Sequence, residues 1–196
     1  MRKVTYVKSG PAEGSLYIGL VADGPREKLY ISQTEYARCG GPIKGEEIDE
    51  DTYYRMARYD EYHKAKKKAL SILTYGDNNT KNLIRKLRVA GFAPDLAEVI
   101  CREMVSLGYI NEEDQLERLI LSEANDKLQG PNKIFAKLTA KGYSSADIRR
   151  VMESLVDRGE INFKNNAYRL IEKKLPNGAT ADEKKILLYK NGYKYD

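Results

Sequence analysis

The chain has 196 residues, of which 41% are hydrophobic and 32% charged, and its net charge is +5. These values are typical of a globular protein with a strongly charged surface. No segment approaches the roughly 18 apolar residues that a membrane span requires, and the N-terminus lacks the apolar core of a secretory signal. We therefore expect a cytoplasmic protein in which Cys39 and Cys101 are small buried residues.

The first fifty residues predict a small β-rich unit followed by a short helix. Three runs rich in β-branched or tyrosine residues are separated by glycine-proline turns, and they cover residues 4–7, 16–21 and 28–31. Ser32 and Glu35 have the spacing of a capping box, so a short helix should follow and end at Gly40-Gly41. A three-stranded meander this small is barely stable alone, so we expect it to pack on helices.

From residue 51 the apolar pattern becomes helical, and a long helix is expected over residues 52–74. The chain then repeats itself, because residues 81–110 align without a gap on residues 132–161. The identical pairs include Gly91 with Gly142 and Gly108 with Gly159. Each of these glycines falls where a helix should end in a left-handed conformation.

A third copy begins near residue 162, and its second helix should precede Gly192-Tyr193, three residues before the sequence stops. We therefore expect residues 162–196 to hold only two helices of this copy. Stacked units of this kind bury a continuous core and form an elongated, curved body. We predict a mainly α protein of tandem three-helix repeats with a β-rich N-terminal extension, divided into residues 1–50, 51–110, 111–161 and an incomplete 162–196.

The sequence offers little for catalysis, and we expect no enzyme, cofactor or metal site. The lone histidine, His63, could act as a general base with Asp60 on the same helical face, but without a nucleophile signal we interpret it as a surface histidine. Acidic clusters at 46–51 and 112–114 fit helix N-termini better than a divalent-metal site. The tyrosines, Tyr143 among them, fit packing better than stacking on bases.

Basic residues are the stronger functional signal. Residues 52–110 carry a net charge of +5 and residues 162–196 a net charge of +4, whereas the other two blocks are each −2. Cations recur at helical spacing without intervening acids, which favours a track for an anion or a protein over a merely solvated face, although both interpretations stay open. The contact candidates are Lys81, Arg85, Lys86 and Arg88, then Lys133, Lys137 and Lys141, and finally Arg149 and Arg150.

Several short motifs resemble those of the RecX family, which modulates the bacterial RecA recombinase. The resemblance covers residues 64–160 and, more loosely, the third copy. Two departures are Asn82, where the family often has an acid, and the sequence Asn111-Glu112-Glu113 in place of a doubled aspartate. The motifs lie at residues 68–73, 83–92, 107–113 and 130–142.

The resemblance implies a non-enzymatic protein that lies along the groove of a RecA–DNA filament. We expect the protein to be a monomer. It would inhibit the recombinase and coprotease activities that serve DNA repair and the SOS response. The alternative is a helical module that binds single- or double-stranded DNA directly, without contact with a recombinase.

Overall fold

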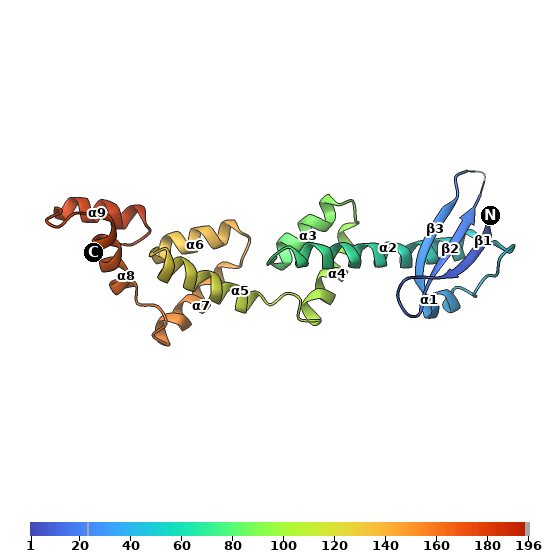
Figure 1. Cartoon of the computed structure of the whole chain (residues 1–196), viewed down its shortest axis with the longest axis horizontal. Coiled ribbons are helices and arrows are strands. Elements are labelled where there is room, and N and C mark those ends of the chain that lie inside the picture. Colours follow the sequence, from blue (N-terminus) through green and yellow to red (C-terminus); the bar gives the residue numbers. More distant parts are fainter. Residues whose placement is uncertain (23, 195–196) are drawn as a thin grey trace. The chain divides into compact units, whose positions relative to one another are not determined.

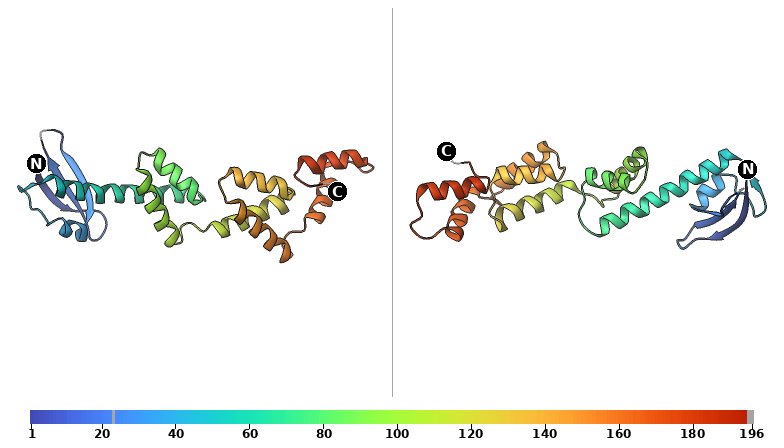
Figure 2. Two further views of the ribbon diagram at one scale, coloured as in Figure 1. Left: turned by 180° about the vertical axis from the view of Figure 1, so that it is seen from behind. Right: turned by 90° about the horizontal axis from the view of Figure 1, so that it is seen from above.

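The computed structural model describes residues 1–22 and 24–194 (Figures 1 and 2). Most of these residues lie in helices, as the sequence predicted. The strands are β1 (Arg2–Ser9), β2 (Ser15–Val21), β3 (Glu27–Ser32) and β4 (Glu47–Ile48). The helices are α1 (Gln33–Arg38), α2 (Glu50–Thr74), α3 (Thr80–Val89), α4 (Pro94–Ser106), α5 (Glu112–Leu121), the π-helical η1 (Ser122–Asp126), α6 (Pro131–Ala140), α7 (Ser145–Asp157), α8 (Phe163–Lys174) and α9 (Ala181–Lys190).

The chain forms two compact units. The first comprises residues 1–75 and 87–102, and the second comprises residues 76–86 and 103–196. The division into four segments that the sequence suggested remains a prediction. No helix among the described residues is both long and apolar enough to cross a membrane.

The sheet of the first unit is antiparallel, with strand order β3-β2-β1-β4. Figure 1 labels β3, β2 and β1, which lie side by side in this order. The three predicted strands are confirmed. The sequence pattern missed β4 because it has only two residues, which pair Ile48 with Arg2 and Glu47 with Lys3. A capping box at Ser32 and Glu35 opens α1, as predicted.

The sheet packs on the first half of α2, which confirms the expected docking of strands on helices. Met56 of α2 is fully buried in one cluster with strand residues such as Ile18 and Ile31. The buried carboxylate of Asp60 accepts a hydrogen bond of 2.9 Å from the backbone N–H of Tyr30. Because β3 is an edge strand, this bond satisfies a donor that has no partner strand.

His63 is more buried than the surface histidine that the sequence suggested, because only 23% of its side chain is exposed and its Nε2 lies 2.7 Å from Glu35 Oε2. Burial raises the pKa of the Glu35 carboxyl, but hydrogen bonds from the Ser32 backbone and from His63 outweigh burial and lower it overall. Asp60 faces the sheet instead and does not orient the imidazole. Cys39 and Cys101 are buried thiols, as expected.

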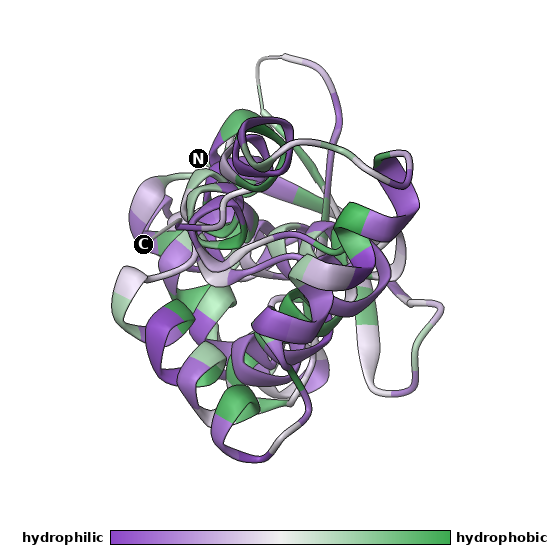
Figure 3. Ribbon diagram, turned by 90° about the vertical axis from the view of Figure 1, so that its left-hand side faces the viewer, coloured by the Kyte–Doolittle hydropathy of each residue, from purple (hydrophilic) through white to green (hydrophobic). Residues whose placement is uncertain are grey.

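Two hydrophobic clusters lie among the described residues of the second unit. The larger joins α5, η1, α6 and α7 through buried residues that include Leu116, Leu138 and Val151. The smaller joins Leu128, Leu170, Leu188 and Tyr193 around α8 and α9. Figure 3 shows purple and green alternating along the helical ribbons, as expected for helices that bury one face.

The repeat is visible in the backbone angles. The middle helices of successive copies are α3, α6 and α9, and each is followed by a glycine with positive φ. These glycines are Gly91, Gly142 and Gly192, with φ of 96°, 94° and 87°. In each case the next residue is aromatic, and its N–H returns to a carbonyl five residues earlier. This is a Schellman ending, which requires a left-handed residue and therefore favours glycine. Asn111 and Asn162, 51 residues apart, cap α5 and α8 with nearly equal angles.

Candidate basic contact surface

Helix α6, the middle helix of the second copy, and helix α9, the corresponding helix of the third copy, meet end to end. Helix α6 begins at Gly130-Pro131 without a side-chain cap, so its first N–H groups need other acceptors. The N–H of Gly130 donates to the Asn191 carbonyl at 2.8 Å, and the N–H of Asn132 donates to the Gly192 carbonyl at 3.1 Å. The C-terminal end of α9 therefore satisfies the N-terminal end of α6.

The N-terminal end of α3 meets the C-terminal end of α6 in the same orientation. Two side-chain amides, from Asn79 and Asn82, donate to the Lys141 carbonyl at 2.9 and 3.0 Å. Asn79 also caps α3 by accepting a bond of 2.8 Å from the Asn82 N–H. At both junctions the negative end of one helix dipole faces the positive end of the next, which is a favourable arrangement.

A polar network holds the start of α3 on the second copy. Glu112 of α5 accepts 2.7 and 2.6 Å bonds from the N–H and hydroxyl of Thr80. The buried hydroxyl of Tyr143 donates to Gln115 at 2.9 Å, and burial raises the pKa of this phenol. Sequence reasoning named Tyr143 and the acidic cluster that contains Glu112 but predicted none of these contacts, because hydrophobic periodicity does not show which polar side chains meet.

Two candidate lysines lie on α6 and a third caps its C-terminal end, and the structure corrects the idea that this series is unpaired. Lys133 is half-buried, and its Nζ lies 3.3 Å from the Lys190 carbonyl. Lys137 forms a 2.7 Å ion pair with Glu123, an acid fourteen residues earlier that η1 brings beside α6. Lys141 is exposed at the helix end. The sequence did not reveal this ion pair, because Glu123 lies fourteen residues before Lys137 and reaches it only through the fold.

Glu123 forms ion pairs with two lysines, Lys137 and Lys127. Its side chain is 9% exposed, and it also pairs with Lys127 at 2.6 Å. Burial raises the pKa of the Glu123 carboxyl, but the hydrogen bonds and charges of Lys127 and Lys137 outweigh burial and hold its pKa below the ordinary value. Lys137 therefore has a structural role in addition to any contact role.

The candidates on α3 are all exposed. Lys86 donates a hydrogen bond of 2.6 Å to Asn78 Oδ1, so this candidate, like Lys137, already has a partner within the chain. Lys81, Arg85 and Arg88 follow at helical spacing, and none of them forms an ion pair within residues 1–22 and 24–194. Arg88 belongs to the first unit, whereas Lys81 and Arg85 belong to the second.

Lys81 continues the line of cations from α6, because its stem lies beside Gly142 at the junction of the two helices. These cations of the second unit form one series along joined helices, which we call the basic row. The basic row consists of Lys133, Lys137, Lys141, Lys81 and Arg85.

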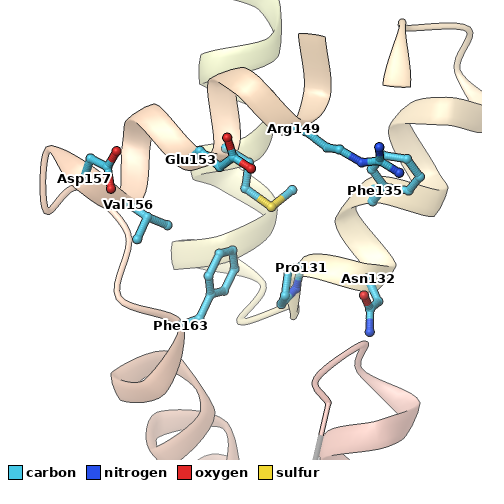
Figure 4. Close-up of a pocket in the computed structure, with 9 residues that line it drawn as sticks. Pro131, Asn132, Phe135, Arg149, Glu153, Val156, Asp157 and Phe163 are labelled. Atoms are coloured by element: carbon cyan, nitrogen blue, oxygen red, sulfur yellow. The ribbon is translucent and has the colours of Figure 1, made fainter. Parts of the chain in front are cut away.

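Arg149 and Arg150 of α7 do not extend the basic row in the same way. Arg150 pairs with Glu113 at 2.8 Å and with Asp147 at 3.3 Å. Arg149 reaches toward Phe135, with its guanidinium carbon 5.1 Å from the ring centre (Figure 4). Glu153 lines the same hollow of about 750 Å³, so the charge around Arg149 is of mixed sign.

Proteins of known name resemble this chain over most of its length, although no family model matches it. The regulatory protein RecX of Clostridioides difficile is 30% identical over 160 residues, which are 78% of this chain and 73% of that protein. The regulatory protein RecX of Caldanaerobacter subterraneus is 25% identical over 164 residues, which are 80% of this chain and 78% of that protein.

A crystal structure of a regulatory protein RecX shows the same fold. It matches with a TM-score of 0.70 and 19% identity, and the match covers 99% of this chain and 95% of that one. The relatives and the fold both agree with the family that the motifs of the sequence indicated. This chain belongs to the RecX family of regulatory proteins.

Proposed function

We propose that this protein binds the RecA recombinase filament and modulates it, in the inhibitory sense, during DNA repair and the SOS response. The observation that carries the proposal is the 30% identity over 160 residues to a protein named as a regulator. The relatives are named regulatory proteins, and the proposed action is binding, which requires neither a catalytic residue nor a cofactor. We propose that the protein acts as a cytoplasmic monomer.

The basic row supplies the contact surface in this proposal. Lys141, Lys81 and Arg85 are available to a partner, because none of them forms an ion pair within the part of the chain that the structure describes. Such cations steer an anionic partner and help to set its orientation. Arg88 lies three residues after Arg85 on α3 and so continues the helical spacing of Lys81 and Arg85.

The remaining candidates contribute less to binding in this account. Lys137 and Arg150 must give up acidic partners, Glu123 and Glu113, before they can serve another molecule. Lys86 and Lys133 are already hydrogen-bonded to Asn78 and to the Lys190 carbonyl. Arg149 rests on Phe135 beside acids and is the weakest candidate.

The proposal is tested by ATP hydrolysis of RecA on single-stranded DNA. Added protein should inhibit hydrolysis at substoichiometric amounts. A variant with Lys81→Ala, Arg85→Ala and Lys141→Ala should require about tenfold more protein, because three unpaired charges are removed. The matched control replaces three exposed lysines outside the basic row, Lys67, Lys68 and Lys173, by alanine. An unchanged rate at equimolar wild-type protein would refute the proposal.

Direct DNA binding is a second candidate, and the basic row is the observation that favours it. This alternative predicts that affinity for bare single-stranded DNA falls steeply with salt, with a log–log slope of about 0.7 for each phosphate neutralised. It also predicts loss of that binding when Lys133, Lys137 and Lys141 are changed to alanine. Weak binding that the three changes leave unaltered would exclude it.

A further inference from the structure

The sheet of the first unit has one face that packs on helices and one that faces away from them. Tyr36 of α1 and Met56 of α2 both pack on the same strand residues, Ile18 and Ile31 among them (Figure 2). Because side chains alternate along a strand, the residues between these core positions point away from the helices. We call this surface the outer sheet face, and its central residues are Tyr6 and Lys8 of β1, Tyr17 and Gly19 of β2, and Lys28 and Tyr30 of β3.

Tyrosine rings cover the middle of the outer sheet face. The ring of Tyr6 lies across Gly19 of the neighbouring strand, and an added Cβ at Gly19 would collide with it. The ring centre of Tyr17 lies 5.3 Å from that of Tyr30. Tyr6 and Tyr17 are diagonal neighbours, because Tyr17 pairs in register with Lys8, so their rings are within reach of one ligand. All three tyrosines are half-buried, so the sheet supports their rings while leaving part of each in contact with solvent.

Two lysines stand beside these rings. The Nζ of Lys28 lies 3.5 Å from the ring centre of Tyr17, and the Nζ of Lys8 lies 5.5 Å from the ring centre of Tyr6. Both lysines are exposed, and neither forms an ion pair within residues 1–22 and 24–194. The face therefore combines aromatic surfaces with uncompensated positive charge.

The acidic side chains of the described strands lie away from the centre of this face. Glu47 of β4 pairs in register with Lys3 at the margin of the sheet, where it offsets the charge of that lysine. Glu27 of β3 instead faces the helices and accepts a hydrogen bond of 3.1 Å from the hydroxyl of Tyr53. The charge at the centre is thus complementary to an anion, and the rings beside it suit an anion that carries planar groups.

We propose that the outer sheet face binds single-stranded DNA. Two successive bases stack on Tyr6 and Tyr17, since every base offers a π-face, and sheets with aromatic side chains on one face bind single strands in this way. Lys8 and Lys28 hold the adjoining phosphates. Lys28 has a flexible stem, so its ammonium can leave the ring of Tyr17 for a phosphate when a base stacks there. The choice of DNA rests on the proposed function, which brings the protein to RecA on single-stranded DNA.

A site of two rings and two lysines predicts weak binding. We expect a Kd of about 0.1–1 mM and a log–log salt slope of about 1.4, because two phosphates are neutralised at about 0.7 each. Binding of this strength is lost when a pull-down is washed. It becomes effective once another surface has docked the protein, because docking raises the local concentration of the strand.

The test is a titration of the full protein with a thymidine tetranucleotide, followed by two-dimensional amide NMR spectra. We expect the amides of β1, β2 and β3 to shift more than those of α3 and α6. Stacking should also move the thymine proton resonances upfield, because the bases then lie over tyrosine rings. This signal comes from the ligand and does not require a variant that folds.

Two double variants separate stacking from charge. Tyr6→Leu with Tyr17→Leu keeps apolar side chains on the sheet but removes both rings, and it should raise the Kd about tenfold. Lys8→Glu with Lys28→Glu changes two exposed residues and should raise it at least as much. Spectra that match the wild type outside the sheet show that each variant folds.

The matched control is Lys67→Glu with Lys68→Glu, which makes the same change of charge on exposed residues of α2 and should bind as the wild type does. Shifts confined to α3 and α6, or no shift at millimolar tetranucleotide, would overturn the proposal. Wild-type affinity of the tyrosine variant would overturn it as well, because charge alone would then hold the strand. Tighter binding of a uridine tetranucleotide would overturn the choice of DNA. None of these results alters the ATP hydrolysis test, so the two proposals can fail separately.

Discussion

The two junctions between middle helices have the same geometry but different chemistry. Where α9 meets α6, backbone N–H groups of Gly130 and Asn132 donate directly to carbonyls. Where α6 meets α3, the side chains of Asn79 and Asn82 span the gap. Asn79 and Gly130 are 51 residues apart and occupy equivalent positions, so the repeat preserves a contact while changing the groups that make it.

The difference determines how much space each junction leaves. A methyl group on Gly130 would lie 2.5 Å from the backbone of Gly192, a distance that requires the two helix ends to move apart. A methyl group on Gly142, at the other junction, would lie 3.2 Å from the flexible Lys81 side chain. We therefore expect the α9–α6 junction to be sensitive to added volume and the α6–α3 junction to be sensitive to lost hydrogen bonds.

The largest effect should come from Gly130→Ala. Its backbone has an ordinary φ of −78°, so steric overlap at the junction is the main cost. We expect a loss of about 2–4 kcal/mol in the free energy of unfolding, from overpacking and from two weakened backbone bonds. Urea denaturation measures the loss, and hydrogen exchange should show that the Asn132 amide becomes unprotected.

The matched control is Gly159→Ala. This glycine has φ of 75° and open space around it, so only left-handed strain of about 1 kcal/mol is expected. If the two alanine variants lose equal stability, the close approach of Gly130 and Gly192 does not hold the junction together.

A smaller effect is expected for Asn79→Ala at the α6–α3 junction. The change removes the cap of α3 and one donor to the Lys141 carbonyl, which should cost about 1–2 kcal/mol. Asn82→Ala removes only the second donor to that carbonyl and should cost about 0.5–1 kcal/mol. Denaturation midpoints of the two variants give the order, and a larger loss for Asn82→Ala would contradict the assignment of Asn79 as the cap.

The smallest effect concerns Glu123, which links η1 to α6, and it depends on pH. Because the folded pKa of this carboxyl is lowered, its ion pairs stabilise the fold above the unfolded pKa of about 4.3, and this stabilisation is lost as the pH falls through the folded pKa. Glu123→Gln should therefore be less stable than the wild type near about pH 7, and the gap should close toward about pH 3. A gap that stays constant across this range would show that the ion pairs do not cause it.

Periodicity and turn chemistry predicted most of the fold. The capping box at Ser32, the glycine endings of the middle helices and the 51-residue offset all correspond to local geometry that a few residues determine. The two-residue strand β4 was missed because its pairing with β1 depends on residues more than forty positions away.

The candidate surface was less predictable, because its contacts also join residues that lie far apart in the sequence. The spacing placed Lys133 and Lys137 correctly on one helix, with Lys141 as the residue that follows its last turn, but the sequence could not show that η1 brings Glu123 to Lys137. The end-to-end contacts of the middle helices were also invisible, since they depend on backbone carbonyls and on the amides of Asn79 and Asn82.

The most direct test of the account is a comparison of binding to RecA filaments and to bare single-stranded DNA in one pull-down. We expect wild-type protein to be retained on the filaments and not on the bare DNA at the same ionic strength. The variant with Lys81→Ala, Arg85→Ala and Lys141→Ala should be retained less, whereas the control variant of Lys67, Lys68 and Lys173 should behave as wild type. Equal retention of wild-type protein on bare DNA and on filaments would contradict the central claim that the protein recognises the recombinase.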